Sequence, residues 1–536
     1  MVHPLAGQKA PTDQLVNLPR LLADYYTIDP ATPIAFGTSG HRGSALVGSF
    51  NENHVAAITA ATAEYRQRRQ HTGPLFLGFD THALSEAAFR TTLEVLAAYG
   101  VPTIIHKKNE YTPTPVISHL IINHNLHHPK ALSDGLIITP SHNPPTDGGL
   151  KYNPPHGGPA DVDVTNWIEK RANELLSKPT TINRWSYLRA RSAETTQEAD
   201  FIRPFVRALN DVVDLPAIKS AGLKLAADPL GGSGINFWGP IAEEWGLNLQ
   251  IVNPIVDASF AFMTLDSDGA IRMDCSSPYA MAGLIQKSGG FDLAFGNDPD
   301  FDRHGIVSGG KLMNPNHFLA VAIDYLLSHR PHWPNRAKVG KTLVSSGLID
   351  QVVATKGREL YETPVGFKWF VEGLTQRSLV FGGEESAGAS LLQRNGSTWT
   401  TDKDGFALTL LAAEIMARIG RAPHELYEIL ATRHGHSHYG RLDTAITESE
   451  KTTLKSIDAA RLVGTICAGR KIIAASTVAA GNNAPIGGLK VILADRSWFA
   501  FRPSGTEPKL KFYVESFSSP EDWRNIVAEA PGLIFN

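Results

Sequence analysis

The sequence predicts an α/β protein made of three related α/β repeats with mixed, mainly parallel sheets, followed by a smaller α+β C-terminal domain. Strand-like apolar runs alternate with helix-like segments over most of the 536 residues, and one unit of this alternation occurs three times. Near residue 425 the pattern changes, and KLKFYVES at 509–516 alternates as a half-exposed strand does. A chain of this length is too long for one core, so we expect several domains.

Each repeat begins with a short apolar strand and a polar turn, continues into amphipathic segments with helical spacing, and reaches a second apolar run. The first runs are LFLGFDTHALS at 75–85, LKLAADPLGGSG at 223–234 and KTLVSSGLID at 341–350. The second runs, each ending in a loop with reactive side chains, are LIITPSHNP at 136–144, FDLAFGNDPDFDR at 291–303 and SLVFGGEESAG at 378–388.

The three loops should meet in one place. In open α/β sheets, ligands bind beyond the carboxyl ends of the strands. Three repeats packed side by side would therefore direct a serine, an aspartate cluster and a glutamate pair at one cleft. RHGHSHYGRLDTA at 433–445 has the composition of a linker into the last unit. We predict domains at 1–205, 206–313, 314–428 and 435–536.

Composition limits the class of partner. Hydrophobic residues make up 42% of the chain and charged residues 19%, as in ordinary globular proteins, and the net charge is -3. This charge gives no reason to expect nucleic acid or an anionic membrane as a partner. Two cysteines, no secretory h-region and no run of about 18 apolar residues predict a reduced, cytoplasmic protein. We expect a monomer or a homodimer.

The segment IITPSHNPPTDGGLKYNPPHGG at 137–158 cannot continue as a helix or a regular ladder. Proline fixes φ and lacks an N–H group, and glycine lets the chain turn. Ser141 and Lys151 therefore lie on a shaped loop just beyond the end of a strand. An isolated Ser-His-Asn sequence would be interpreted as a surface turn. The presence of the other two loops with reactive side chains favours a functional site instead.

Aspartates alternate in NDPDFDR at 297–303. In an extended loop, a period of two places Asp298, Asp300 and Asp302 on one side, where they could bind a hard divalent cation. An EF-hand is excluded, because Gly309 stands where its bidentate glutamate is needed. A solvated acidic turn is the alternative. The adjacent Arg303 suggests a phosphate ligand.

Three further loops could bind parts of a sugar phosphate. RPSGTEPK at 502–509 combines an arginine, hydroxyls and glycine-exposed N–H groups, which is typical of a phosphate nest. FGTSGHRG at 36–43 is a second glycine-rich basic loop, and GGEESAG at 382–388 offers acceptors for sugar hydroxyls. The candidate residues on these loops are Arg502, Ser504, Gly505, Thr506, Lys509, Arg42, Glu384 and Ser386.

Two other patterns are set aside. VGKT at 339–342 ends like a P-loop but lacks the required first glycine, and a strand rather than a helix follows it. HGHSH at 434–438 could bind zinc, although solvated histidines in a linker are the simpler interpretation.

Four motifs in order carry a resemblance to a known family. TPSHNP with a lysine ten residues past the serine, DPDFDR, GEES and RPSGTEP resemble the signature loops of the α-D-phosphohexomutases, over essentially the full chain. Within that superfamily the chain is most similar to bacterial glucose-type phosphoglucomutases. The resemblance implies four domains round a central cleft, the first three with one topology.

The resemblance also implies residue roles. Ser141 would carry a phosphoryl group, and Mg²⁺ would be held by Asp298, Asp300, Asp302 and the phosphoserine. Lys151 would be the general acid/base, with a pKa that neighbouring cations lower, and His142 and Arg42 would lie close to the transfer. The implied substrate contacts are Arg303, Thr363, Glu384, Ser386, Lys403 and the Arg502 loop with Ser504, Gly505 and Thr506, while Lys509 is a weaker candidate.

The implied reaction interconverts glucose 1-phosphate and glucose 6-phosphate through bound glucose 1,6-bisphosphate. The expected partners are small sugar phosphates. A phosphomannomutase or phosphoglucosamine mutase would share Ser141 and the aspartates, and GEES, TPVGFKWF at 363–370 and full-length similarity favour glucose. A metal-dependent phosphatase and a non-enzymatic scaffold are the remaining alternatives.

Overall fold

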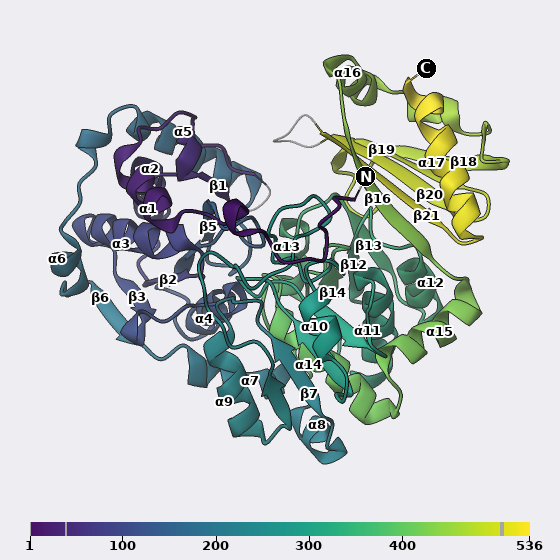
Figure 1. The fold of residues 1–536 in the computed structure, drawn as a ribbon, viewed down its shortest axis with the longest axis horizontal. Coiled ribbons are helices and arrows are strands. Elements are labelled where there is room, and N and C mark those ends of the chain that lie inside the picture. Colours follow the sequence, from purple (N-terminus) through teal and green to yellow (C-terminus); the bar gives the residue numbers. More distant parts are fainter. Residues whose placement is uncertain (1, 38–39, 504–508, 536) are drawn as a thin grey trace.

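The computed structural model describes residues 2–37, 40–503 and 509–535. It contains four sheets, one within each predicted domain range, and they follow one another from purple to yellow in Figure 1. The predicted α/β class is confirmed. The first three sheets are mixed, with parallel pairs around a central strand and antiparallel pairing toward one edge, and the fourth is antiparallel.

The first sheet has the order β1-β5-β4-β2-β3-β6. Its strands are β1 (His41–Ser44), β2 (Leu75–Phe79), β3 (Thr103–His106), β4 (Asp134–Ile138), β5 (Asp147–Asn153) and β6 (Thr196–Ala199). The helices around it are α1 (Leu18–Thr27), α2 (Glu52–Arg69), α3 (Ala83–Ala98), α4 (Thr114–His127), α5 (Val162–Leu176) and α6 (Tyr187–Arg191).

The second sheet has the order β11-β10-β9-β7-β8. Its strands are β7 (Leu225–Asp228), β8 (Leu249–Ile251), β9 (Leu293–Gly296), β10 (Gly305–Ser308) and β11 (Lys311–Leu312). Its helices are α7 (Ile202–Val212), α8 (Leu215–Ala221), α9 (Ile235–Trp245) and α10 (Ala282–Lys287).

The third sheet has the order β13-β12-β14-β15. Its strands are β12 (Lys338–Thr342), β13 (Leu360–Thr363), β14 (Leu379–Gly383) and β15 (Ala389–Leu391). Its helices are α11 (Pro315–His329), α12 (Leu348–Thr355), α13 (Lys368–Gln376), α14 (Gly405–Ile419) and α15 (Pro423–His434).

One topology recurs in these three sheets. In each, a central strand has a parallel neighbour on both sides, and one neighbour continues through a loop into an antiparallel strand. The three looped pairs are β4/β5, β9/β10 and β14/β15. The repeat read from the sequence is therefore a structural repeat.

The last sheet has the order β16-β21-β20-β19-β18-β17. Residues 438–445 belong to it as edge strand β16, so the sequence interpretation of 433–445 as a linker is wrong over most of its length. The elements are β16 (His438–Ala445), β17 (Ile466–Cys467), β18 (Arg470–Val478), β19 (Pro485–Leu493), β20 (Trp498–Pro503), β21 (Lys509–Ser516), α16 (Glu448–Ser456) and α17 (Pro520–Phe535).

An aromatic cluster joins the second and third domains. Phe205 of α7 and Phe406 of α14 lie 5.7 Å apart between ring centroids, and Trp399 lies 5.6 Å from Phe205. Phe301, from the aspartate loop, stacks on Phe406 at 4.6 Å. These rings are fully buried or nearly so, and burial of such large apolar surfaces is the main stabilising contribution at this junction. The junction thus supports the loops described below.

No helix within the described residues is long and apolar enough to cross a membrane.

Candidate active site

Three equivalent strand-to-strand loops meet where the domains join. The loop after β4 carries Ser141, and the loop after β9 carries the aspartates. Ser141 Oγ donates a hydrogen bond to Asp298 Oδ2 at 3.0 Å, and Lys151 Nζ lies 2.5 Å from Asp300 Oδ2. The loop after β14 joins through Lys403, whose Nζ is 3.0 Å from Asp302 and 3.9 Å from Glu384. The side chains predicted from separate motifs therefore converge.

Ser141 is held in an unusual backbone conformation. Its φ is 59°, in the left-handed region that costs a non-glycine residue about 1–3 kcal/mol. Its N–H group donates to Thr139 Oγ1 at 2.8 Å. β5 passes close behind at Gly149, where a Cβ atom would lie 2.3 Å from the Thr139 carbonyl oxygen. The loop is thus shaped by tertiary contacts, which agrees with the proline- and glycine-rich sequence.

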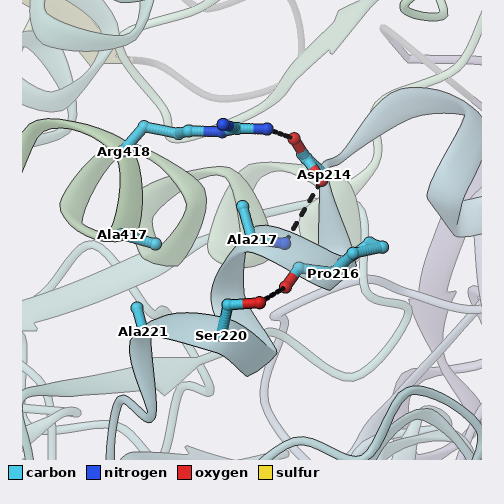
Figure 2. Close-up of a pocket in the computed structure, with 7 residues that line it drawn as sticks. All are labelled: Asp214, Pro216, Ala217, Ser220, Ala221, Ala417 and Arg418. Atoms are coloured by element: carbon cyan, nitrogen blue, oxygen red, sulfur yellow. Dashed lines mark hydrogen bonds and ion pairs between the residues drawn. The ribbon is translucent and has the colours of Figure 1, made fainter.

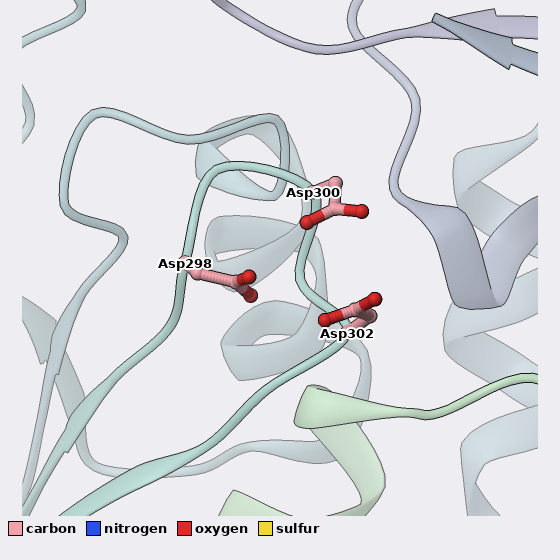
Figure 3. Close-up of side chains that lie close together, drawn as sticks. All are labelled: Asp298, Asp300 and Asp302. Carbon is pink, nitrogen blue, oxygen red and sulfur yellow. The ribbon is translucent and has the colours of Figure 1, made fainter. Parts of the chain in front are cut away.

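The three aspartate side chains turn toward one another, as Figure 3 shows. One oxygen from each lies within 4.8 Å of the others, and all three residues are buried. The loop does not run extended as the sequence argument assumed, because it turns at Phe301, where φ is 58°. The alternation of Asp298, Asp300 and Asp302 nevertheless places their carboxylates together, and the alternative of a solvated acidic turn is wrong.

The carboxylate cluster fits a divalent cation. Within the described residues, Asp300 Oδ1 and Asp302 Oδ1 are buried without a hydrogen-bond partner. Burial and the two neighbouring carboxylates raise the pKa of Asp298 well above its usual value. Carboxylate oxygens of this kind, buried and close together, are the ligands that Mg²⁺ takes.

Lys151 differs from the prediction in one respect. Burial alone lowers its pKa, but attraction to Asp300 and Asp302 outweighs burial, and the net shift of the pKa is upward. The expectation of a lowered pKa is therefore wrong, because the nearest charges to the ammonium group are carboxylates rather than cations. In this arrangement Lys151 is protonated and holds a proton that it could give to an oxygen gaining negative charge, but the raised pKa makes it a weaker acid than an ordinary lysine.

Other predicted residues surround the serine. His142 Nδ1 is 3.3 Å from Ser141 Oγ, and burial together with Arg303 lowers the pKa of His142 well below its usual value. Arg42, on β1, donates to Asn143 Oδ1 at 3.4 Å. Arg303 lies 3.8 Å from both Asp298 and Asp302, measured from its Nε. The serine therefore has cationic side chains around it.

The loop after β14 presents the predicted sugar-binding groups. Glu384 Oε1 accepts from the Gly366 N–H group at 3.1 Å, which fixes the carboxylate beside the segment that follows Thr363. Burial raises the pKa of Glu384, against the opposing effect of Lys403. Ser386 is half-buried on the same loop. Lys403 bridges this loop to the aspartates, and the His304 N–H group donates to the Ala387 carbonyl at 3.0 Å.

The fourth loop lies between β20 and β21. Arg502 is on β20, and Lys509 begins β21, whereas the predicted Ser504, Gly505 and Thr506 lie outside the described residues. Arg502 pairs in register with Lys511, whose pKa is lowered by burial and then by Arg441 and Arg502. Three cations thus gather beside the predicted phosphate nest.

Sequence reasoning missed several members of this site. Thr114 at the start of α4 donates to Asp300 Oδ2 at 2.9 Å, and Asp274 lies 4.0 Å from the Arg303 guanidinium. Lys511 and Arg441 lie beside Arg502. Lys511, in alternation with Lys509, could have been noticed in KLKF, whereas Thr114 and Asp274 are in segments without a distinctive pattern.

A separate cavity carries none of these groups. It has a volume of about 430 Å³ and lies between α8 and the end of α14 (Figure 2). Asp214 and Arg418 form an ion pair in its wall, and four of its seven lining residues are alanine or proline. This cavity lacks the chemistry of a catalytic site.

Models of one protein family match most of the chain. They are described as phosphoglucomutase/phosphomannomutase alpha/beta/alpha domains I, II and III, at residues 33–178, 203–311 and 314–433, and the C-terminal domain, at 462–530. The phosphoglucomutase of Komagataeibacter xylinus is 52% identical over 540 residues, which cover 99% of this chain and 97% of the relative. This chain belongs to the phosphoglucomutase/phosphomannomutase family.

Solved structures of the family have the same fold. Parafusin of Paramecium, an exocytosis-sensitive phosphoprotein described as a phosphoglucomutase and solved in an open form, gives a TM-score of 0.73 at 20% identity, covering 94% of each chain. The N-acetylphosphoglucosamine mutase of Aspergillus fumigatus, in complex with GlcNAc-6P and magnesium, gives a TM-score of 0.57 at 14% identity, covering 97% of this chain and 99% of that one. These likenesses extend the shared fold over nearly the full length of each chain.

Proposed function

We propose that this family member is an isomerase that interconverts α-D-glucose 1-phosphate and D-glucose 6-phosphate through phosphorylated Ser141 and bound glucose 1,6-bisphosphate. The observation that carries the proposal is the hydrogen bond of 3.0 Å between Ser141 and Asp298. It joins a loop serine, a possible nucleophile, to a buried carboxylate cluster that could hold a cation, and this combination is suited to phosphoryl transfer through a phosphoserine. The 52% identity to a named phosphoglucomutase supports glucose as the sugar.

The phosphoryl group passes from Ser141 to the sugar phosphate, and Lys151 exchanges the protons. The bond between Ser141 Oγ and phosphorus breaks while a bond forms from phosphorus to the free hydroxyl of the sugar phosphate. Lys151 gives a proton to Ser141 Oγ and takes up the proton that the sugar hydroxyl loses. The bisphosphate then reverses its orientation and returns its other phosphoryl group to Ser141. His142, Arg42 and Arg303 stabilise the charge on the transferring group.

Asp298, Asp300 and Asp302 would hold Mg²⁺ together with the phosphoserine. When bound, the cation neutralises negative charge on the transferring phosphoryl group. The carboxylates are already in place for this role, since Thr114 orients Asp300 and Arg303 lies against Asp298. Lys151 and Lys403 balance the remaining charge of the cluster.

The sugar and the second phosphate would be bound by the other two loops. Thr363, Glu384 and Ser386 would contact ring hydroxyls, and Lys403 would lie on the side of the phosphate. Arg502, with Ser504, Gly505 and Thr506, would bind the phosphate that is not reacting. The additional cations Lys511 and Arg441 beside Arg502 support an anion site there.

Other family activities are the main alternative. A phosphomannomutase or phosphoglucosamine mutase would use the same serine and aspartates and differ at Glu384 and Ser386. A phosphatase would pass the phosphoryl group to water, and a scaffold would need none of these groups. The intact cluster at Ser141 and Asp298 favours an enzyme over a scaffold.

A coupled assay of glucose 1-phosphate conversion tests the proposal, run with and without glucose 1,6-bisphosphate and beside mannose 1-phosphate and glucosamine 1-phosphate. We expect fastest turnover of the glucose compound and activation by bisphosphate. Release of free phosphate in place of glucose 6-phosphate would show a phosphatase. Faster turnover of another sugar would reassign the substrate.

The cytoplasmic location, the monomeric or dimeric state, the absence of nucleic-acid partners and the domain boundaries at 205, 313 and 428 stay predictions from the sequence.

A further inference from the structure

A buried polar pair, Asp80 and His82, lies behind the serine loop and reaches Ser141 only indirectly, through Thr139 and Asn143. It comes from the segment GFDTHALS at 78–85, the polar turn that ends β2. The side chains of Asp80 and His82 are both 0% exposed. Burying a carboxylate and an imidazole lowers the stability of the fold unless both groups are hydrogen-bonded and their charges are paired. The contacts of Asp80 and His82 therefore show how these groups are tolerated.

Asp80 accepts hydrogen bonds on both oxygens. Its Oδ1 accepts from the His82 N–H group at 3.0 Å and from Ser85 Oγ at 2.6 Å. Its Oδ2 lies 2.8 Å from His82 Nδ1 and accepts from Thr139 Oγ1 at 2.7 Å. A carboxylate surrounded by donors in this way is ionised, and these contacts lower the pKa of Asp80 against the opposing effect of burial.

His82 faces an acceptor at each ring nitrogen. Nδ1 meets the Asp80 carboxylate, and Nε2 lies 3.1 Å from the carbonyl oxygen of Asn143. A backbone carbonyl cannot donate, and Asp80 is occupied as an acceptor, so both ring nitrogens must carry protons. The ring is therefore an imidazolium, and its other charged neighbour is the carboxylate of Asp147.

The two residues bind opposite ends of the Ser141 turn. Asp80 holds Thr139 Oγ1, and the same hydroxyl accepts the Ser141 N–H group at 2.8 Å. His82 holds the carbonyl of Asn143, whose side chain in turn accepts from Arg42. Ser141, with its φ of 59°, thus lies between Thr139 and Asn143, and these two residues are hydrogen-bonded to the two members of the Asp80–His82 ion pair.

The same ion pair lies at the junction with the second domain. The ring of His82 is 5.1 Å from that of Phe260, which is fully buried and comes from the segment after β8. The cation is therefore covered by an aromatic ring from the domain that supplies the aspartates. Movement of the serine loop relative to the aspartate loop would disturb this contact.

We propose that Asp80 and His82 are positioning residues for the phosphoryl-transfer reaction: they hold the Ser141 turn open in its left-handed conformation and place a buried imidazolium behind it. The role rests on the proposed function of Ser141 as the phosphate carrier. Among the described residues, neither side chain has a hydrogen bond or ion pair with the loops assigned to the sugar, so their loss should slow transfer and leave substrate affinity largely unchanged.

The sharpest test separates the two arms of the network. Thr139→Val removes the hydroxyl that links Asp80 to Ser141 and keeps the side-chain shape, whereas Thr139→Ser keeps the hydroxyl. We expect Thr139→Val and His82→Gln to lower kcat by about 10- to 100-fold with KM changed less than about threefold, as expected for misplaced reacting groups. Thr139→Ser should restore most of kcat. His124→Gln, a histidine on α4 outside the network, should match the wild type.

Two further measurements make the outcome decisive. Imidazole ¹⁵N spectra at pH 7, with His82 assigned from His82→Gln, should show both ring nitrogens protonated, and Asp80→Asn should abolish that signature. Intact mass should show slower uptake of phosphate from glucose 1,6-bisphosphate by Thr139→Val. Urea unfolding identifies any variant that has merely lost stability.

A neutral His82 ring in the wild type, or wild-type kcat and phosphate uptake in both Thr139→Val and His82→Gln, would overturn the proposal. Failure of the proposed function would look different, because the wild type itself would take up no phosphate from the bisphosphate.

Discussion

Ser141 Oγ and Asp298 Oδ2 lie 3.0 Å apart, although 157 positions separate the two residues in the chain. The contact joins the first domain to the second and places a nucleophilic hydroxyl at a cluster of buried carboxylates. Because the site is buried, water screens its charges only weakly. Such a site is suited to phosphoryl transfer, which depends on charged groups that are already in place around the reacting phosphate.

Ser141→Ala should lower mutase activity by several orders of magnitude. It should leave the fold intact, because a loop serine contributes little packing. The wild type should carry one phosphate by intact mass and the variant none. Ser220→Ala, on the surface of α8, is the matched control and should behave as the wild type. Comparable turnover by Ser141→Ala would disprove the phosphoserine mechanism.

Asp300→Asn should weaken Mg²⁺ binding, since it removes one charged oxygen ligand from the cluster. We expect activity to fall and to recover in part at high metal concentration, measured as a magnesium titration of turnover. Asp268→Asn, an acidic residue of the same domain paired with Arg272, should not shift the titration. An unchanged magnesium requirement in Asp300→Asn would remove Asp300 from the metal site.

Glu384→Ala should impair sugar positioning more than phosphate binding. The carboxylate is fixed by the Gly366 N–H group and faces the region assigned to ring hydroxyls, so we expect lower turnover of glucose 6-phosphate and weaker discrimination against mannose phosphates. Glu372→Ala, exposed on α13, serves as the control. If kinetics and selectivity stay as in the wild type, sugar recognition lies elsewhere.

Arg502→Ala should weaken both directions of the reaction by similar factors, because the intermediate reverses and the same site must bind either phosphate. Loss of a desolvated charge pair corresponds to about 2–4 kcal/mol in each direction. The bisphosphate should also escape more often, so the variant should need added glucose 1,6-bisphosphate. Kinetics in both directions, with Arg524→Ala on α17 as control, test this. A loss in one direction only would limit Arg502 to one binding orientation.

Protonation of His119, a half-buried histidine on α4, should limit stability in acid. His119 packs on Trp399 at 4.5 Å, and burial lowers its pKa to about 4 from an unfolded value near 6.5. Between these values the unfolded chain binds the extra proton, so the contribution of His119 is complete above about pH 6.5 and is lost as the pH falls toward 4. His119→Phe keeps the ring packing and should make the urea midpoint fall less steeply over this range. The exposed His332→Phe should leave the slope unchanged, and equal slopes for all three proteins would contradict the assignment.

The sequence by itself determined the α/β class, the threefold repeat and the residues with reactive chemistry. These features are local. The apolar composition of segments such as 75–79 and 136–138 predicts strands, and the prolines and glycines around Ser141 exclude a helix there. The grouping of Asp298, Asp300 and Asp302, predicted from their spacing for an extended loop, is also present in the loop that turns at Phe301.

Tertiary structure alone decided which charges face one another. Lys151 was expected among cations, yet its nearest charged neighbours are Asp300 and Asp302, and the sign of its pKa shift follows from that contact. The strand at 438–445 formed because β21 offered an unpaired edge, which composition does not reveal. Asp80 and His82 look like an ordinary turn in the sequence and acquire a role only when the Ser141 loop packs on them. Burial and long-range pairing set these charges and edges, and neither is a property of a local sequence pattern.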